Sequence, residues 1–154
     1  MLRRRAPGGA DINTLKVLAQ NKVHDTRDGI AGRGVLLDIP AVRGVPWLEP
    51  GDCVTADDLA AAQDAQQVRV GPGDLLFVRV GHRLRREQLG PWDVASARAG
   101  LHPRAVVYLA ERSVAALGSD GNSDTAPSVV DGVAFPVHVL AINALGLQRF
   151  GIDK

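Results

Sequence analysis

The stretch from Val114 to His138 constrains the fold of this chain more than any other part of its sequence. It begins with the apolar run VAAL, continues through a polar loop that holds Asp120, Asn122 and Asp124, and reaches a histidine before a further apolar segment. Short continuous apolar runs are typical of buried strands, and open α/β sheets bind their ligands just past the carboxyl ends of such strands. We therefore expect an α/β domain with a site at this loop.

The first half of the chain shows the pattern of a crossover unit. Gly34–Pro40 is a continuous apolar run that ends at a proline, which predicts a buried strand. Thr55 and Asp58 form the capping box of a helix over residues 56–66, and the apolar run over residues 75–80 predicts a second strand. A strand, a helix and a strand in this order indicate a parallel or mixed sheet.

The second half continues the alternation. His102 and Pro103 begin a predicted helix that runs to about Arg112, because the missing N–H of a proline costs nothing in a first helical turn. This helix leads into the strand of the VAAL run. Residues 136–145 carry apolar side chains at a spacing that favours a helix, which Gly146 is expected to end.

Length and composition set broad limits. The 154 residues suit one domain, and we expect residues 1–11 to be disordered and residues 12–154 to form a single domain. The net charge of +1, from 18 basic and 17 acidic residues, gives no overall field to hold nucleic acid. Arg83–Arg86 fits a solvated helix face.

The cysteine content and the lengths of the apolar runs indicate where in the cell the protein is located. Cys53 is the only cysteine, which excludes a disulfide or a thiolate metal cluster within one chain. No apolar run approaches the roughly 20 residues that span a bilayer, and the arginine-rich start lacks the apolar core of a signal peptide. We expect a cytoplasmic protein that binds neither nucleic acid nor a membrane.

Five segments, taken in order, resemble one family: DGIAGRGVLLDI, WLEPGD, GDLLFVRVGH, AALGSD and PVHVLAINALG. Together they resemble the cyclase-type metal-dependent hydrolases, which include bacterial kynurenine formamidase and isatin hydrolase. The resemblance implies an α/β fold with a mixed, partly barrel-like sheet and flanking helices. It also implies a homo-oligomer that hydrolyses an amide or cyclic amide bond of a small-molecule substrate with zinc or manganese, which lowers the pKa of a bound water.

The resemblance assigns residues to a site, although it leaves the catalytic residue unknown. His138 and Asp153 match metal-ligand positions, the latter displaced by two residues, and Asp120, Asn122 and Arg79 match the substrate cleft. Each assignment has an alternative. An isolated histidine before an apolar run is also typical of a core residue bonded to backbone, the last acidic residue can be a simple terminal carboxylate, and Asp and Asn side chains in loops form turns with their own backbone.

The chain departs from the family pattern at both ends. Members carry a motif of the form HxGTHxDxxxH, or a variant beginning GTQWD, which supplies most metal ligands; this sequence lacks it. Members also continue through a helix and closing strands beyond the position of Lys154. We therefore expect a middle fragment of a cyclase-like domain whose hydrolase activity is impaired or absent. The alternative is a non-catalytic interaction module that associates through exposed sheet edges.

Overall fold

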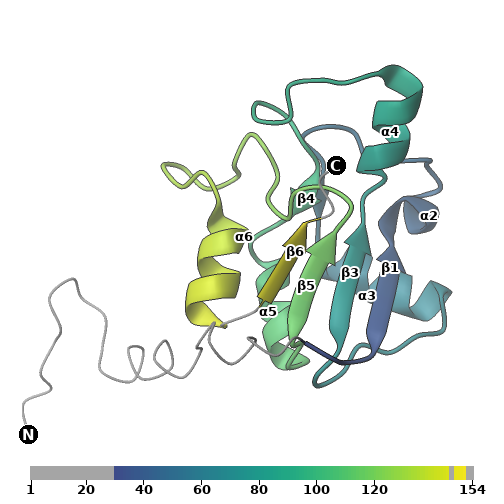
Figure 1. Ribbon diagram of the computed structural model, residues 1–154, viewed down its shortest axis with the longest axis vertical. Helices are drawn as coiled ribbons and strands as arrows, with labels where there is room; N and C mark the ends of the chain where they lie inside the picture. The colour runs from purple at the N-terminus through teal and green to yellow at the C-terminus, as the bar shows by residue number, and fades with distance from the viewer. Residues whose placement is uncertain (1–29, 146–147, 152–154) are drawn as a thin grey trace, which may run out of the picture.

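The computed structural model of the chain describes residues 30–145 and 148–151 (Figure 1). Its helices and strands follow one another as β1 (Gly34–Asp38), α2 (Ile39–Arg43), β2 (Cys53–Val54), α3 (Ala56–Ala65), β3 (Leu75–Arg79), α4 (His82–Leu89), β4 (Gly100–Leu101), α5 (Ala105–Glu111), β5 (Ala116–Ser119), α6 (Pro136–His138), the π-helix η2 (Val139–Ala144) and β6 (Gln148–Gly151). Residues 1–11, which we expect to be disordered, lie outside the described residues.

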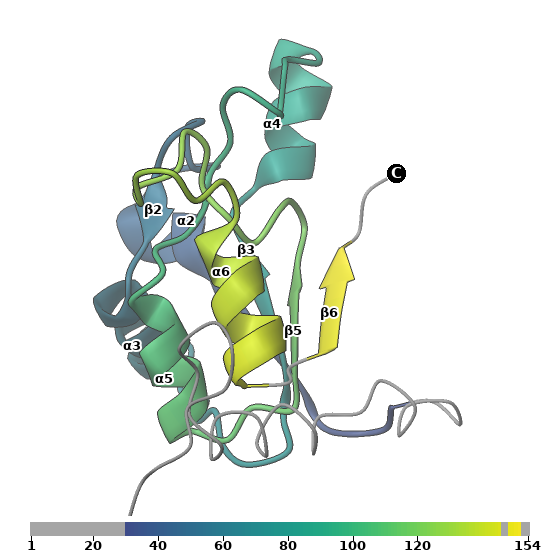
Figure 2. The same cartoon turned by 90° about the vertical axis from the view of Figure 1, so that its left-hand side faces the viewer.

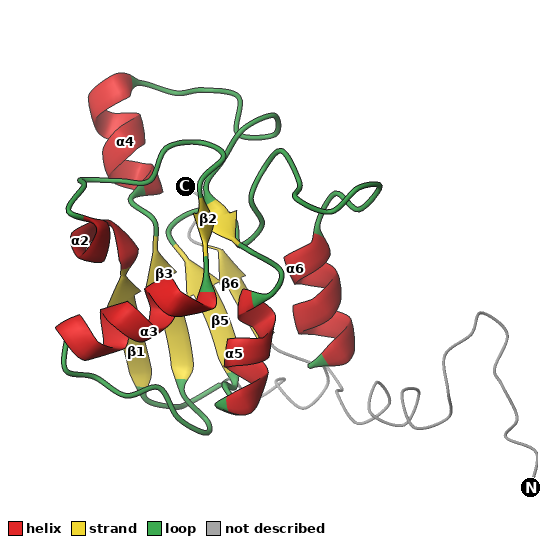
Figure 3. Ribbon diagram, turned by 180° about the vertical axis from the view of Figure 1, so that it is seen from behind, coloured by secondary structure: helices red, strands yellow, loops and turns green. Residues whose placement is uncertain are grey.

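A four-stranded parallel sheet organises the described residues. Its strand order is β1-β3-β5-β6, so each new strand is added on the same side of the one before it. Because crossovers between parallel strands have one hand, such an order places all the connecting helices on the same face. Helices α3, α5 and α6 do lie together on one face of the sheet, as Figures 2 and 3 show. A second sheet pairs β2 with β4, also in parallel.

The predicted α/β class with flanking helices is confirmed. Both sheets pair in parallel, and an isolated bridge between Arg98 and Ala126 is antiparallel. The barrel-like closure that the resemblance implies is not found among the described residues, since β1 and β6 each pair with one strand there. No helix in the described part of the chain is long and apolar enough to cross a membrane.

The two faces of the sheet differ in burial. Along β1 the side chains of Val35 and Leu37 are buried against the helices, whereas Leu36 between them is 52% exposed. The same alternation runs along β3, where Leu76 and Val78 are buried and Phe77 is only partly buried. Successive side chains of a strand point to opposite faces, so the core lies on the helix side and the other face remains open.

Several elements differ from the sequence-based expectations, and Ile39 and Pro40, which are predicted to end the first strand, begin α2 instead. The strand predicted at the VAAL run begins at Ala116 rather than Val114, because the two residues before it leave the end of α5 and turn into the sheet. Strand β6 is not predicted, because its residues QRFG contain no continuous apolar run. The helices predicted over residues 56–66, 102–112 and 136–145 are confirmed within three residues at each end. Helix α4 is the solvated helix expected at Arg83–Arg86, with no buried residue.

The capping box of α3 also fastens α2. Thr55 Oγ1 accepts a hydrogen bond from the backbone N–H of Asp58 at 3.3 Å, and Asp58 accepts one from the backbone N–H of Thr55 at 2.7 Å. The guanidinium of Arg43, at the end of α2, donates to both carboxylate oxygens of Asp58 at 3.0 and 2.7 Å. Burial raises the pKa of Asp58, but the hydrogen bonds from Arg43 and Thr55 outweigh it and lower the pKa.

Replacing Asp58 with alanine removes this junction, and we expect the free energy of unfolding in urea to fall by about 1–2 kcal/mol at pH 7. The folded pKa of Asp58 is depressed, so its contribution is complete above the unfolded pKa and is lost as the pH falls through the folded pKa. The difference in the free energy of unfolding between Asp58→Ala and wild type should therefore become smaller at acidic pH. Asp64→Ala removes an exposed ion pair to Arg69 and serves as the control, with an expected loss below about 0.5 kcal/mol. Equal losses in the two variants would contradict this account.

Candidate functional site

A buried carboxylate and a half-buried histidine meet where the loop after β5 reaches α6. Asp124 is fully buried, and its carboxylate accepts hydrogen bonds from the backbone N–H groups of Val137 at 2.6 Å and His138 at 3.2 Å. The same carboxylate bonds the ring Nδ1 of His138. Negative charge is favoured at a helix N-terminus, so Asp124 holds both the first turn of the helix and the ring.

This contact defines which nitrogen of His138 is available for chemistry. A carboxylate accepts hydrogen bonds, so Nδ1 of His138 carries the proton toward Asp124, and in the neutral ring Nε2 keeps its lone pair. The side chain of His138 remains 31% exposed. A histidine held in this way can accept a proton or ligate a metal through Nε2. The alternative of a core histidine bonded to backbone does not describe its ring, which bonds a carboxylate.

The backbone at Asp124 is held by close packing against β4. A β-carbon built on Gly100 would lie 2.4 Å from the carbonyl carbon of Asp124 and 2.6 Å from the amide nitrogen of Thr125. Leu101 donates its N–H to the carbonyl of Ser123 at 2.8 Å, beside this contact. Only a residue without a side chain permits this approach, so Gly100 helps to set where the carboxylate lies.

The residues after His138 form a π-helix, η2, which continues α6. Short π-helical segments inside helices occur frequently at functional sites. The ring of Phe135, just before α6, lies edge-on to the ring of His138 with a centroid distance of 5.4 Å. Phe135 is 44% exposed, so the pair of rings forms an accessible surface beside Asp124.

Asp120 and Arg79 lie at the carboxyl ends of β5 and β3. Asp120 accepts hydrogen bonds from the backbone N–H groups of Val80 at 2.7 Å and Gly81 at 3.0 Å, which ties the two strand ends together. Arg79 pairs with Asp38 at 2.7 Å, its neighbour across the β1–β3 ladder. Both side chains are thus engaged in contacts that fix the strand ends.

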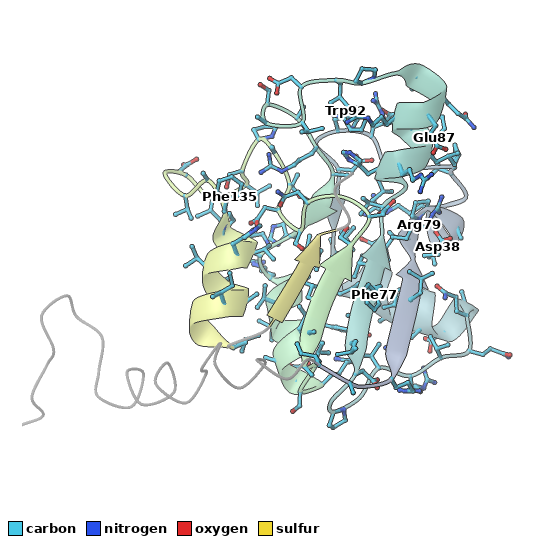
Figure 4. The ribbon with its side chains drawn as sticks, viewed as in Figure 1. Asp38, Phe77, Arg79, Glu87, Trp92 and Phe135 are labelled. Carbon is cyan, nitrogen blue, oxygen red and sulfur yellow. The ribbon has the colours of Figure 1, made fainter. Side chains whose placement is uncertain are left out.

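A cavity of about 610 Å³ lies on the open face of the sheet, and Asp120 and Arg79 line it. Its other lining side chains include Leu36, Phe77 and Leu84, which are apolar. In Figure 4, Phe77 lies on the open face of the sheet, while Arg79 and Asp38 lie at its carboxyl end, below α4. The cavity is therefore mainly apolar with charged groups at one end.

The structure thus distributes the predicted residues over different places. His138 lies against Asp124. Asp120 and Arg79 line the cavity on the open face of the sheet. Asn122 accepts a hydrogen bond from the backbone N–H of Asp124 at 2.9 Å. The last of these is the local turn that the sequence allows as an alternative. Asp153 lies outside the described residues.

Asp124 is the residue that the sequence-based assignment missed as the partner of His138. It stands among several turn-forming residues in GSDGNSD, and nothing local separates it from its neighbours. A chemical signal could have identified it. A lone histidine that begins a helix needs an acceptor for its ring N–H, and the helix needs an anion or a cap at its N-terminus. One upstream carboxylate can meet both needs.

The described residues do not fit a metal ion by themselves. No group of three or more histidine, cysteine or acidic side chains with metal-binding geometry occurs within residues 30–145 and 148–151. The carboxylate of Asp124 already accepts from two backbone N–H groups and a ring nitrogen, so it supports His138 rather than acting as a second ligand. Protein sites for zinc use three or four ligands.

We expect Gly100→Ala to displace Asp124, because the added methyl group would overlap its backbone. The free energy of unfolding should fall by about 1–3 kcal/mol, as it does for overpacked sites, and the amide NMR signals of residues 123–126 and 137–138 should move most. Gly71→Ala is the matched control, since a β-carbon at Gly71 meets nothing within 4 Å. Similar stability and spectra for the two variants would refute the role of Gly100.

Comparison with known protein families gives a match over most of the chain. The sequence model of the Cyclase family, described as "Putative cyclase", matches residues 7–124. This range includes Asp120 and Asp124 and ends before His138. No curated protein matches the chain significantly.

Several solved structures share the fold. A crystal structure of a novel cyclase is 27% identical with a TM-score of 0.65, over 79% of this chain and 40% of that one. Isatin hydrolase A from Ralstonia solanacearum is 22% identical with a TM-score of 0.62, over 99% of this chain and 54% of that one. A potential metal-dependent hydrolase with cyclase activity is 17% identical with a TM-score of 0.52, over 95% of this chain and 55% of that one.

This chain spans between 40% and 55% of the length of those three structures. The family match itself covers more than half of the chain. The resemblance seen in the sequence is therefore confirmed at the level of the family. The chain belongs to the Cyclase family, whose fold it shares with metal-dependent hydrolases.

Proposed function

We propose that this chain is part of a cyclase-family hydrolase and contributes the Asp124–His138 pair to the hydrolysis of an amide or cyclic amide bond, as in arylformamidases. The observation that carries the proposal is the orientation of His138, whose Nδ1 is fixed on a buried carboxylate, while Nε2 has no hydrogen-bond partner among the described residues. The fold likeness to isatin hydrolase A supports a substrate of this class, a small molecule with a ring or acyl amide.

The pair suits the proton transfers of such a reaction. In amide hydrolysis water adds to the carbonyl carbon, the C–N bond breaks, and the amine leaves with a proton. Nε2 of His138 can accept a proton from the attacking water and return it to the leaving amine, while the carboxylate of Asp124 stabilises the charged ring in between. This use of a histidine requires no movement of Asp124.

We further propose that the chain alone is impaired or inactive as a hydrolase. A divalent ion, zinc or manganese, would supply an activated water in the complete family site, but the described residues offer one suitable histidine and no cluster of ligands. The position of Asp153, the second predicted ligand, is not described. We also propose that the protein acts on a small molecule, forms a homo-oligomer and is cytoplasmic. We propose no binding to nucleic acid or to a membrane.

The alternative function is that of a non-catalytic interaction module. Its supporting observation is the open face of the sheet, where Leu36 is 52% exposed and Phe77 lines a mainly apolar cavity. Parallel sheets are commonly covered on both faces, so this surface is suited to burial against another polypeptide. Association through this face without the His138-dependent ester hydrolysis tested below would favour the module, whereas retention of that rate would favour the impaired enzyme.

The first test is hydrolysis of N-formylkynurenine and of isatin by the purified chain, with zinc, with manganese and with a chelator present. We expect less than one equivalent of metal by elemental analysis and no rate above the chelated control. Stoichiometric metal together with metal-dependent hydrolysis that His138→Ala abolishes would overturn the proposed impairment. His102→Ala is the control, since His102 Nδ1 accepts a local hydrogen bond from Arg104 at the start of α5.

The second test examines the pair without metal, using an activated ester, p-nitrophenyl acetate, with a chelator present. We expect His138→Ala to remove the histidine-dependent part of the rate and Asp124→Asn to lower it by about tenfold or more, because the amide does not fix the ring tautomer as a carboxylate does. The His102→Ala variant should retain the wild-type contribution of His138. Unchanged rates in both site variants would rule out Nε2 of His138 as an accessible base.

A further inference from the structure

Arg98 is the arginine, among those described, that the fold buries, with 6% of its surface exposed. Arginine is rarely buried unless its charge is paired, and none of the described carboxylates forms an ion pair with this one. Its partners are instead backbone carbonyls, those of Asp124 at 2.9 Å, Val94 at 2.9 Å and Ala95 at 3.2 Å. The guanidinium therefore holds two loops together at a considerable desolvation cost.

One of these loops carries the carboxylate of the site. Nε of Arg98 donates to the carbonyl of Asp124 itself, while the backbone N–H and C=O of Arg98 exchange hydrogen bonds with Ala126, both at 3.0 Å. The side chain of Arg98 thus holds the backbone at Asp124, and the backbone of Arg98 holds it two residues later, at Ala126. The planar fork of a guanidinium fixes direction as well as distance, which a single point donor cannot do.

The same guanidinium also reaches the other neighbour of His138. Its central carbon lies 5.2 Å from the centroid of the Phe135 ring, and that ring lies edge-on to His138. A cation over an aromatic face is attractive and is stronger when water is excluded. Arg98 therefore contacts both groups that flank the imidazole, Asp124 through its carbonyl and Phe135 through its ring.

We propose that Arg98 is a positioning residue that fixes the tautomer and orientation of His138 through Asp124 and Phe135. The inference rests on the proposed function, since it concerns the same pair. It adds that the pair depends on a cation more than 20 residues away in sequence, which touches neither Nε2 nor any reacting atom. The test measures the tautomer of the His138 ring directly, so its result does not depend on whether the chain hydrolyses an amide.

The experiment is long-range ¹H–¹⁵N NMR of the imidazole of His138 at a pH where the ring is neutral, in the full chain. In wild type we expect the Nδ1–H tautomer. In Arg98→Met we expect the ratio of Nε2–H to Nδ1–H tautomers to rise by about tenfold or more, with the amide signals of β3 and β5 unchanged. Arg86→Met, on the exposed face of α4, is the matched control and should leave the ring spectrum as in wild type.

A purely structural role would lower stability without changing the tautomer in the folded protein. Should Arg98→Met fail to fold, Arg98→Lys preserves the buried stem and the charge but lacks the fork, and the same shift in tautomer is expected. A wild-type His138 spectrum in either variant, once folded, overturns the proposal. Loss of the Nδ1–H tautomer in the arginine variants but not in Arg86→Met supports it.

Discussion

A carboxylate taken out of water must recover the hydrogen bonds that it loses, and the way Asp124 recovers them determines the geometry of the site. Its two oxygens accept from the first N–H groups of the helix at Val137 and His138 and from the ring of His138. Leaving any one of these donors unmatched would cost free energy, because the carboxylate is fully buried. The direction of the helix and the orientation of the ring are therefore set by one group.

The sequence predicts the sheet better than the site, and the reason lies in the range of the signals. Continuous apolar runs and the Thr55–Asp58 capping box are local, and they correctly predicted β1, β3 and α3. Asp120 and Asp124, by contrast, stand four residues apart in the same turn-rich loop. What separates them is distant in sequence: Asp120 accepts from Val80 and Gly81, whereas Asp124 packs on Gly100 and binds His138.

Among the described residues, the open face of the sheet and the lack of a group of metal ligands have a common physical basis. Helices α3, α5 and α6 lie on one face because the strands are added in one direction, and among the described elements only α4 reaches the other face, near the carboxyl ends of the strands. The solved structures of the same fold are about twice as long as the part that this chain matches. A further layer on the open face would bury Leu36 and Phe77 and would bring additional side chains to the carboxyl ends of β3 and β5.

The Asp124–His138 pair does not depend on such a layer for its own geometry. Three described groups hold it: Gly100 lies against the backbone of Asp124, Arg98 binds its carbonyl, and Phe135 packs on the ring of His138. Preorganisation of this kind is what allows a histidine to act without rearrangement of its surroundings. The described residues therefore hold no group of three metal ligands by themselves, but they do hold the contacts that orient His138.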